Sequence, residues 1–115
     1  MITWHPDFLE GYETTDLALP GATVIAGEPE GVEPVATLVR RAPGNESRRA
    51  VLYLHGWNDY FFQVHVAEAL FRLGYDFFAL DLRRYGRSLR RGQLHGFITD
   101  LDHYGEELAA AAEVI

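Results

Sequence analysis

The residues best suited to chemistry lie in one short stretch, His55-Gly56-Trp57-Asn58-Asp59, which directly follows four apolar residues. Glycine permits a sharp turn, and either Asn58 or Asp59 is suited to cap a helix. A strand, a turn and a helix N-terminus place free backbone N–H groups at the carboxyl edge of a sheet, where open α/β sheets bind ligands. We therefore expect this turn to border a functional site.

The chain contains two serines, Ser47 and Ser88. Ser47 belongs to Asn45-Glu46-Ser47, which is typical of a turn. Ser88 lies in Gly86-Arg87-Ser88-Leu89-Arg90, which lacks the second glycine of a G-x-S-x-G nucleophile elbow and a strand–turn–helix context. We therefore expect neither serine to act as a nucleophile.

Two further clusters have both a functional and a structural interpretation. Asp100 and His103 share a helix face and could ligate a metal, but two ligands make a weak site. With Asp102 they are better explained by helix capping and by the helix dipole, so we expect no metal. Five arginines could bind an anionic lipid or a phosphate, and we favour a solvated loop in which they pair with acidic neighbours: Arg83, Arg84, Arg87, Arg90 and Arg91.

Composition narrows the classes of protein. The 115 residues suffice for one domain, and the net charge of −7 argues against a nucleic-acid partner, which requires a basic face. The absence of cysteine excludes disulfides and thiolate metal sites. The first residues include neither a basic segment nor an apolar run, so we expect no signal peptide, no transmembrane segment and a cytoplasmic location.

Hydrophobic periodicity predicts an α/β fold. Alternating and apolar runs predict strands over 12–19, 35–41, 49–55 and 75–82. The first two have no helical pattern between them and should form an antiparallel pair, whereas 49–55 reads as a central strand covered on both faces.

Two amphipathic stretches predict helices, over 59–73 and from Asp100 to the end. Gly74 is expected as the C-cap of the first, and Thr99, with Asp102 in capping-box spacing, as the N-cap of the second. The strand–helix–strand order from 49 to 82 predicts a parallel, right-handed βαβ unit. In the final helix we expect six buried positions: Leu101, Tyr104, Leu108, Ala111, Ala112 and Ile115.

Three motifs in order resemble a known family: Leu54-His55-Gly56-Trp57, then Ala79 to Ser88, then Phe97 to Asp102. Over roughly residues 35–115 the chain resembles the N-terminal part of an α/β-hydrolase. It is most similar to serine hydrolases of the monoacylglycerol lipase and lysophospholipase kind. It departs from that family at Arg84-Tyr85, where Gly-Xaa is more common, and this departure bears on the shape of that loop.

The resemblance implies that residues 1–115 are the N-terminal portion of one α/β-hydrolase domain, ending before the nucleophile elbow. It implies cofactor-free hydrolysis of a small acyl ester or lipid through an acyl-enzyme, with the Trp57 backbone N–H in the oxyanion hole. His55 is then expected to brace the loop, because the family supplies its base near the C-terminus. Gly56 is expected to shape the loop, so that a Cβ there would displace the Trp57 N–H.

The remaining site expectations concern the substrate. Asn58 and Tyr60 are expected to contact it, with Trp57 and Tyr60 near the site mouth, while Phe61 is equally suited to the core. An alternative function is a non-catalytic α/β binding or assembly module of the same fold. A dinucleotide-binding function ranks third, because no G-x-G-x-x-G follows a strand.

The same resemblance predicts an interaction surface. In that fold the strand over Val51–Leu54 would lie between two neighbours, one of which falls outside residues 1–115. The strand is apolar and contains neither proline nor charge, so it has none of the usual protections of a sheet edge. We therefore expect a homo-oligomer that pairs through this edge.

Overall fold

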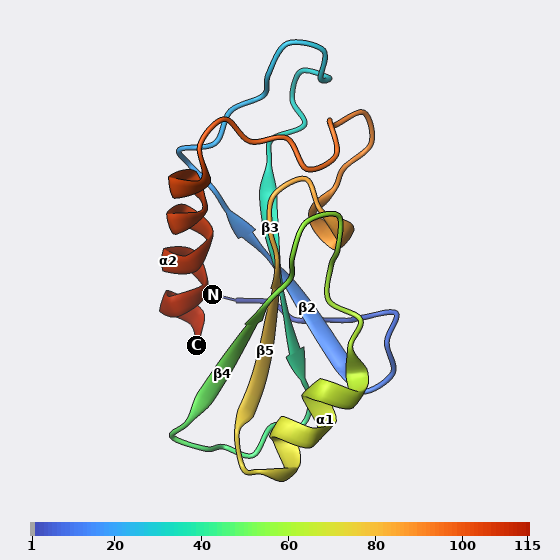
Figure 1. Cartoon of the computed structure of the whole chain (residues 1–115), viewed down its shortest axis with the longest axis vertical. Coiled ribbons are helices and arrows are strands. Elements are labelled where there is room, and N and C mark those ends of the chain that lie inside the picture. The colour runs from blue at the N-terminus through green and yellow to red at the C-terminus, as the bar shows by residue number, and fades with distance from the viewer. Residues whose placement is uncertain (1) are drawn as a thin grey trace.

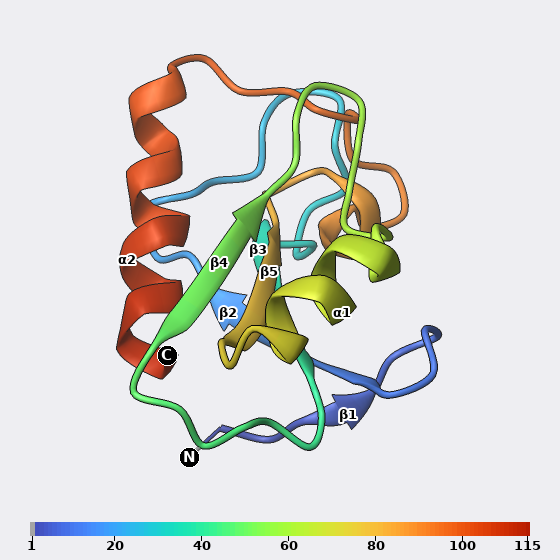
Figure 2. The same cartoon turned by 60° about the horizontal axis from the view of Figure 1, so that its bottom comes forward.

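The computed structural model describes residues 2–115, which form one mixed sheet with helices on both faces (Figures 1 and 2). The strand order is β1-β2-β3-β5-β4. The elements are β1 (His5–Pro6), β2 (Tyr12–Ala18), β3 (Val35–Arg41), β4 (Ala50–Leu54), α1 (Val64–Arg72), β5 (Asp76–Asp81) and α2 (Gly105–Val114). Two short 3₁₀ turns, η1 (Gly86–Ser88) and η2 (Leu101–Tyr104), lie between β5 and α2. No helix in residues 2–115 is both long enough and apolar enough to span a bilayer.

The predicted α/β class and strand pairs are confirmed. β2 and β3 are antiparallel along their whole length, from Tyr12 opposite Arg41 to Ala18 opposite Val35. β4 and β5 are parallel and are joined through α1, which is the predicted βαβ unit. β5 also pairs with β3 in the antiparallel sense, so it is the strand that joins the two halves of the sheet.

The prediction of a central strand over 49–55 is wrong. β4 pairs with β5 alone and forms one edge of the sheet, and its end residues Ala50 and Leu54 are exposed. The separate expectation that Val51–Leu54 is a free edge is confirmed for the described residues. The apolar run reflects packing against the two faces of the sheet, where Leu52 contacts one core and Val51 and Tyr53 the other, and not the presence of a neighbouring strand on each side.

Each face of the sheet carries its own core. Alternate residues of the strands point to opposite faces, so Leu38 and Leu80 pack beneath α2 with Ala111, whereas Val39 and Ala79 pack beneath α1 with Ala67. Figure 2 shows the two helices on either side of the strands. Of the residues predicted to be buried in the final helix, Ala111 is buried and Tyr104 is half-buried. The other four are exposed: Leu101, Leu108, Ala112 and Ile115.

Both helices begin later than predicted. α1 starts at Val64 instead of residue 59, because the backbone of Phe61 is bonded elsewhere: its N–H donates to Asp81 and its carbonyl accepts from Arg87. Gly74, with φ +93°, ends α1 as expected. The final helix begins at Gly105 after η2, whose N-cap is Asp100, with its carboxylate accepting from the Asp102 N–H at 2.9 Å. The capping expectation for Thr99 is therefore wrong by one residue.

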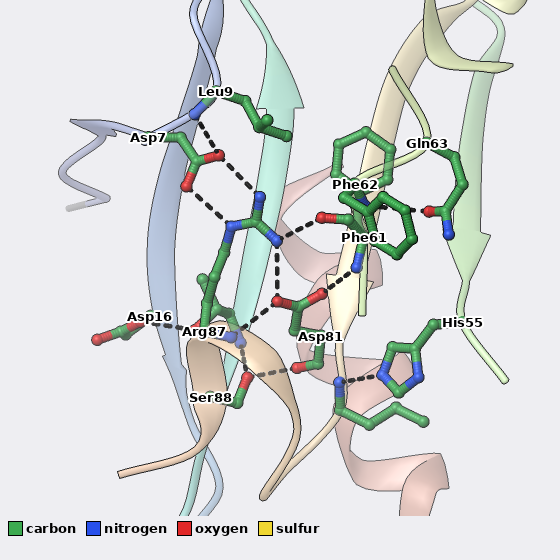
Figure 3. Close-up of polar contacts among 12 residues, drawn as sticks. Asp7, Leu9, Asp16, His55, Phe61, Phe62, Gln63, Asp81, Arg87 and Ser88 are labelled. Carbon is green, nitrogen blue, oxygen red and sulfur yellow. Dashed lines mark hydrogen bonds and ion pairs between the residues drawn. The ribbon is translucent and has the colours of Figure 1, made fainter. Parts of the chain in front are cut away.

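A buried carboxylate connects the end of β5 to three other segments (Figure 3). Asp81 is fully buried, and its side chain accepts hydrogen bonds from the Phe61 N–H at 2.9 Å and from the Arg87 N–H at 2.9 Å. The Arg87 guanidinium is 3.0 Å from Asp81 and also makes two 2.8 Å bonds to Asp7. The N-terminal segment, the segment before α1 and η1 thus meet at one arginine–carboxylate cluster.

We expect Asp81→Ala to lower the free energy of unfolding by about 3–5 kcal/mol, because removing one partner leaves buried donors unpaired. Glu13→Ala is the matched control. It removes a partly exposed ion pair with Arg40 and should cost less than about 1 kcal/mol. Urea unfolding of the two variants measures the difference, and equal costs would contradict the role of Asp81.

Candidate active site

An apolar pocket of about 310 Å³ lies at the carboxyl ends of β4 and β5. This volume is at the small end of ligand sites. The pocket is lined by His55, Gly56, Trp57, Leu82, Tyr85, Gly96, Ile98, Leu101 and Tyr104. Three of the five residues expected at the site, His55, Gly56 and Trp57, therefore meet at one cavity.

His55 joins the two strand ends. It is buried, its Nδ1 lies 2.8 Å from the Gly56 carbonyl oxygen, and its Nε2 lies 3.0 Å from the Leu82 backbone nitrogen. Because a backbone N–H only donates, Nε2 must be the acceptor and Nδ1 must carry the proton. A neutral imidazole with both nitrogens in use braces the turn and is not free to act as a base.

Trp57 and Gly56 form the rim of the pocket. The Trp57 side chain is 79% exposed, and its indole meets the Tyr85 ring edge-on at 6.4 Å. A Cβ built on Gly56 would have no atom within 4 Å, and its φ is not positive. The expectation that a Cβ at Gly56 would displace the loop is therefore wrong. The left-handed residue of this turn is Asn58, with φ +54°.

Asn58 and Tyr60 do not line the pocket, in contrast to the expectation that they contact substrate. The Tyr60 ring packs against Phe62 at 5.2 Å and lies within 6 Å of the Arg87 guanidinium. Phe61 is fully buried in the core beneath α1. The chain turns away from the pocket after Trp57, so side chains close to it in sequence point elsewhere.

The far wall of the pocket comes from residues that the sequence did not single out as ligand contacts. Gly96 has φ +69°, and a Cβ there would lie 3.1 Å from the Tyr85 hydroxyl. Burial, together with the neighbouring Tyr85 hydroxyl and Glu107, raises the pKa of Tyr104 to about 12, so its phenol is neutral. One feature of the sequence could have identified this wall. Its residues lie in a glycine-containing loop between a strand and a helix, and binding residues are concentrated in such loops.

Buried arginines hold that loop in place. Arg84 has φ +62°, and its guanidinium makes 2.7 and 2.8 Å bonds to Glu28, whose side chain is fully buried. The Arg84 carbonyl accepts from the Gly96 N–H at 2.9 Å, and Glu28 also accepts from the Leu94 N–H at 2.9 Å. The ion pair with Glu28 thus holds the loop at Arg84, the position where the sequence departs from the hydrolase motif. The bond from the Gly96 N–H to the Arg84 carbonyl connects this part of the loop to the pocket wall.

The predicted pairing of the arginines with acidic residues is confirmed for four of the five. The expectation that their loop is solvated is wrong for three of them, whose side chains are largely buried. Arg83 and Arg84 are buried against Glu107 and Glu28. The Arg87 side chain is only 9% exposed, and Arg90 pairs near the surface with Asp16. No ion pair is found for Arg91 among residues 2–115. With their charges already matched internally, these four guanidiniums do not form an anion site.

The remaining candidates have structural roles. Ser88 is fully buried, and its hydroxyl donates to the Asp81 carbonyl and accepts from the Thr37 N–H. The Ser47 hydroxyl accepts from the Arg49 N–H. Within residues 2–115 no group of three or more metal-ligating side chains is found, and the Nδ1 of His103 lies 3.5 Å from the Thr99 hydroxyl.

Comparison of the chain with protein-family models, with curated proteins and with solved structures finds no significant match. The site is an apolar, uncharged cavity with an exposed main-chain turn at its rim and no lysine or arginine in its lining. Such a cavity suits an uncharged apolar group.

We expect Gly96→Val to weaken binding of an apolar ligand about tenfold, because the added side chain enters the space beside Tyr85 and Trp57. Quenching of Trp57 fluorescence by 1-octanol, in a Trp4→Phe background, measures this. Gly105→Val is the control, because a Cβ at Gly105 meets open space while Gly105 lies outside the lining of this pocket, and this variant should bind like the parent. Thermal unfolding checks that both variants are folded, and equal affinities would contradict the assigned wall.

Glu28 makes stability depend on pH. Hydrogen bonds from Arg84 lower the pKa of Glu28 to about 2. A lowered folded-state pKa gives stability that is present above the unfolded value near 4.5 and is lost as the pH falls towards 2.

We therefore expect Glu28→Gln to lower the free energy of unfolding most above pH 5, with the difference from the parent shrinking as the pH falls from about 4.5 towards 2. Urea unfolding at a series of pH values provides the measurement. Glu30→Gln, which alters an exposed neighbour, is the control and should show no such convergence. A pH-independent difference for Glu28→Gln would rule out the proposed ion-pair origin.

Proposed function

We propose that this chain supplies the substrate pocket and one oxyanion donor of a serine hydrolase that cleaves neutral acyl esters. The observation that carries the proposal is the apolar pocket beside the His55-Gly56-Trp57 turn, at the carboxyl ends of two parallel strands. In open α/β sheets this is the edge at which ligands bind. The sequence motifs that resemble the α/β-hydrolases fall on the same turn and on the loop that faces it.

The proposed chemistry is acyl transfer to a serine followed by hydrolysis. The Trp57 backbone N–H stabilises the oxyanion of the tetrahedral intermediate, a contribution of about 10²–10³ in rate for one donor. His55 positions that donor by holding the turn to Leu82. The proposal requires the nucleophile, base and acid to come from outside residues 1–115, because the hydroxyls of Ser47 and Ser88 are engaged in turn and core hydrogen bonds.

The lining of the pocket favours an ester over a free carboxylate. Burying a carboxylate without a partner is costly, and no cationic side chain lines the pocket. His55 also lines the pocket, and its two ring nitrogens are engaged by the backbone, Nδ1 with the Gly56 carbonyl and Nε2 with the Leu82 N–H. The pocket is thus suited to the uncharged acyl ester and unsuited to the acid that hydrolysis produces, which favours product release.

Ligand selectivity tests this in the chain itself. We expect methyl octanoate to bind at least about tenfold more tightly than octanoate at neutral pH, because only the anion must be desolvated without a counter-charge. Trp57 fluorescence in the Trp4→Phe background reports both ligands. Equal binding, or preference for the acid, would contradict the proposed substrate class.

Activity provides the second test. Residues 1–115 alone should not hydrolyse p-nitrophenyl esters above background, and labelling of Ser47 or Ser88 by a fluorophosphonate would overturn the role given to the chain.

In a polypeptide that joins this sequence to a triad, replacing the Trp57 amide by a backbone ester should lower kcat about 10²–10³-fold. An unchanged kcat would remove Trp57 from the mechanism. Ligand binding without any labelled serine in such a polypeptide would favour the alternative, a non-catalytic binding module.

A further inference from the structure

Two tyrosines, which we call the phenol pair, bring hydroxyl groups to the otherwise apolar pocket. Tyr85, in the loop after β5, and Tyr104, the last residue of η2, both line it. Tyr85 is only 4% exposed, so its hydroxyl can be reached only through the pocket. This enclosure is provided entirely by residues 2–115.

The phenol pair has at least one hydrogen-bond donor to spare. Among residues 2–115, a hydrogen bond of standard geometry is found for one tyrosine hydroxyl, that of Tyr12 to Glu68. Tyr85 and Tyr104 influence each other, since burial and the nearby Tyr85 hydroxyl raise the pKa of Tyr104 to about 12. A bond between the two hydroxyls would engage only one of their two O–H donors. The other donor is then left for a ligand.

Gly96 leaves the Tyr85 hydroxyl uncovered. Its φ of +69° favours glycine, and a Cβ there would lie 3.1 Å from the hydroxyl oxygen. The Tyr85 ring is held between three other rings. Its centroid lies 4.7 Å from that of His55, 5.3 Å from that of His95 and 6.4 Å from that of Trp57. The hydroxyl thus has a fixed position and is not covered by a side chain at residue 96, as selective hydrogen bonding to a ligand requires.

We propose that the pocket selects ligands that carry an uncharged oxygen, as a keto or hydroxyl group, which accepts a hydrogen bond from the phenol pair. The inference rests on the proposed function in one respect, since it takes this oxygen to belong to the acyl chain of the ester. Tyr85 and Tyr104 are then specificity-determining residues. The neutral ester of the proposed function becomes one whose acyl chain is oxygenated.

Desolvation is the physical basis of this selection. A plain hydrocarbon chain would displace water from the pocket and leave a phenol donor buried without an acceptor, which is unfavourable. A keto or hydroxyl oxygen has two lone pairs, so it can accept from both phenols. A carboxylate could accept as well, but it would be buried without a cationic side chain in the lining. An uncharged oxygen therefore fits the pocket best.

Two ligands without an ester bond test the selection. Cyclohexanone and methylenecyclohexane have nearly the same shape, and only the ketone accepts hydrogen bonds. Shifts of the Gly96 and Trp57 amide NMR signals give their dissociation constants for the 115-residue chain and for the Tyr85→Phe/Tyr104→Phe double variant. We expect the double variant to bind cyclohexanone about tenfold more weakly, and methylenecyclohexane at least as tightly as the parent does, because only the ketone loses hydrogen bonds.

A matched variant and a measurement on the parent make the test specific. Tyr75→Phe removes a hydroxyl outside the pocket lining and should leave both dissociation constants unchanged. Thermal unfolding checks that the variants are folded. In the parent itself, cyclohexanone should shift the NMR signals of the Tyr85 and Tyr104 Cζ carbons more than methylenecyclohexane does. Equal shifts, an unchanged affinity of the double variant for cyclohexanone, or an equal loss for both ligands would overturn the proposal.

Failure of this proposal and failure of the proposed function can be told apart. Neither ligand has an ester bond to cleave, so loss of the ketone selection would leave the fluorophosphonate and kcat tests as they stand. Ketone selection in a polypeptide that fails those tests would support the role of the phenol pair and contradict the hydrolase.

Discussion

The buried Asp81 carboxylate is the constraint on which the rest of this structure depends. It ends the strand that joins both halves of the sheet, and it fixes the backbone of Phe61 and of Arg87. By holding Phe61 out of the helix it places that ring in the core beneath α1. By holding Arg87 it starts the loop whose later residues form the far wall of the pocket. A buried ion pair is weak evidence for net stability, but here it determines where three segments of the chain lie.

The first turn of the loop after β5 contains two left-handed residues, Gly86, whose residue type permits this conformation, and Arg84, which is held in it by its partners. Gly86 has φ +46°, and a Cβ there would lie 2.7 Å from the Asp81 carboxylate, so glycine is required on two grounds. Arg84 adopts φ +62° without that freedom. Its two bonds to Glu28 and its burial offset the cost of a conformation that L-residues resist. Through its bonds to Arg84, Glu28 therefore helps to position a pocket wall that it does not itself line.

Prediction from sequence succeeded where the signal is local. Alternation and apolar runs located β2, β3, β4 and β5 to within about two residues, and Gly74 marked the end of α1. Prediction failed for the start of α1, because that boundary depends on a residue distant in the sequence. Nothing near Phe61 indicates that its N–H donates to a carboxylate twenty residues away. For the site, His55, Gly56 and Trp57 were identified because a strand and a turn signal adjoin. Gly96 and Tyr104 were not, since their part in the pocket arises only when Arg84 brings their loop to the strand ends.

The bond between Asp7 and Arg87 joins residues 80 positions apart, and the Gly21–Glu106 bond spans 85. Closing loops of this length costs chain entropy that a folding nucleus cannot recover from a single contact. The β2–β3 hairpin and the βαβ unit can each form from nearer residues, so docking of the N-terminal segment belongs late in folding. Contacts that are absent from the transition state affect mainly the unfolding rate. Docking of residues 2–8 should therefore slow unfolding and prolong the lifetime of the native state without speeding its formation.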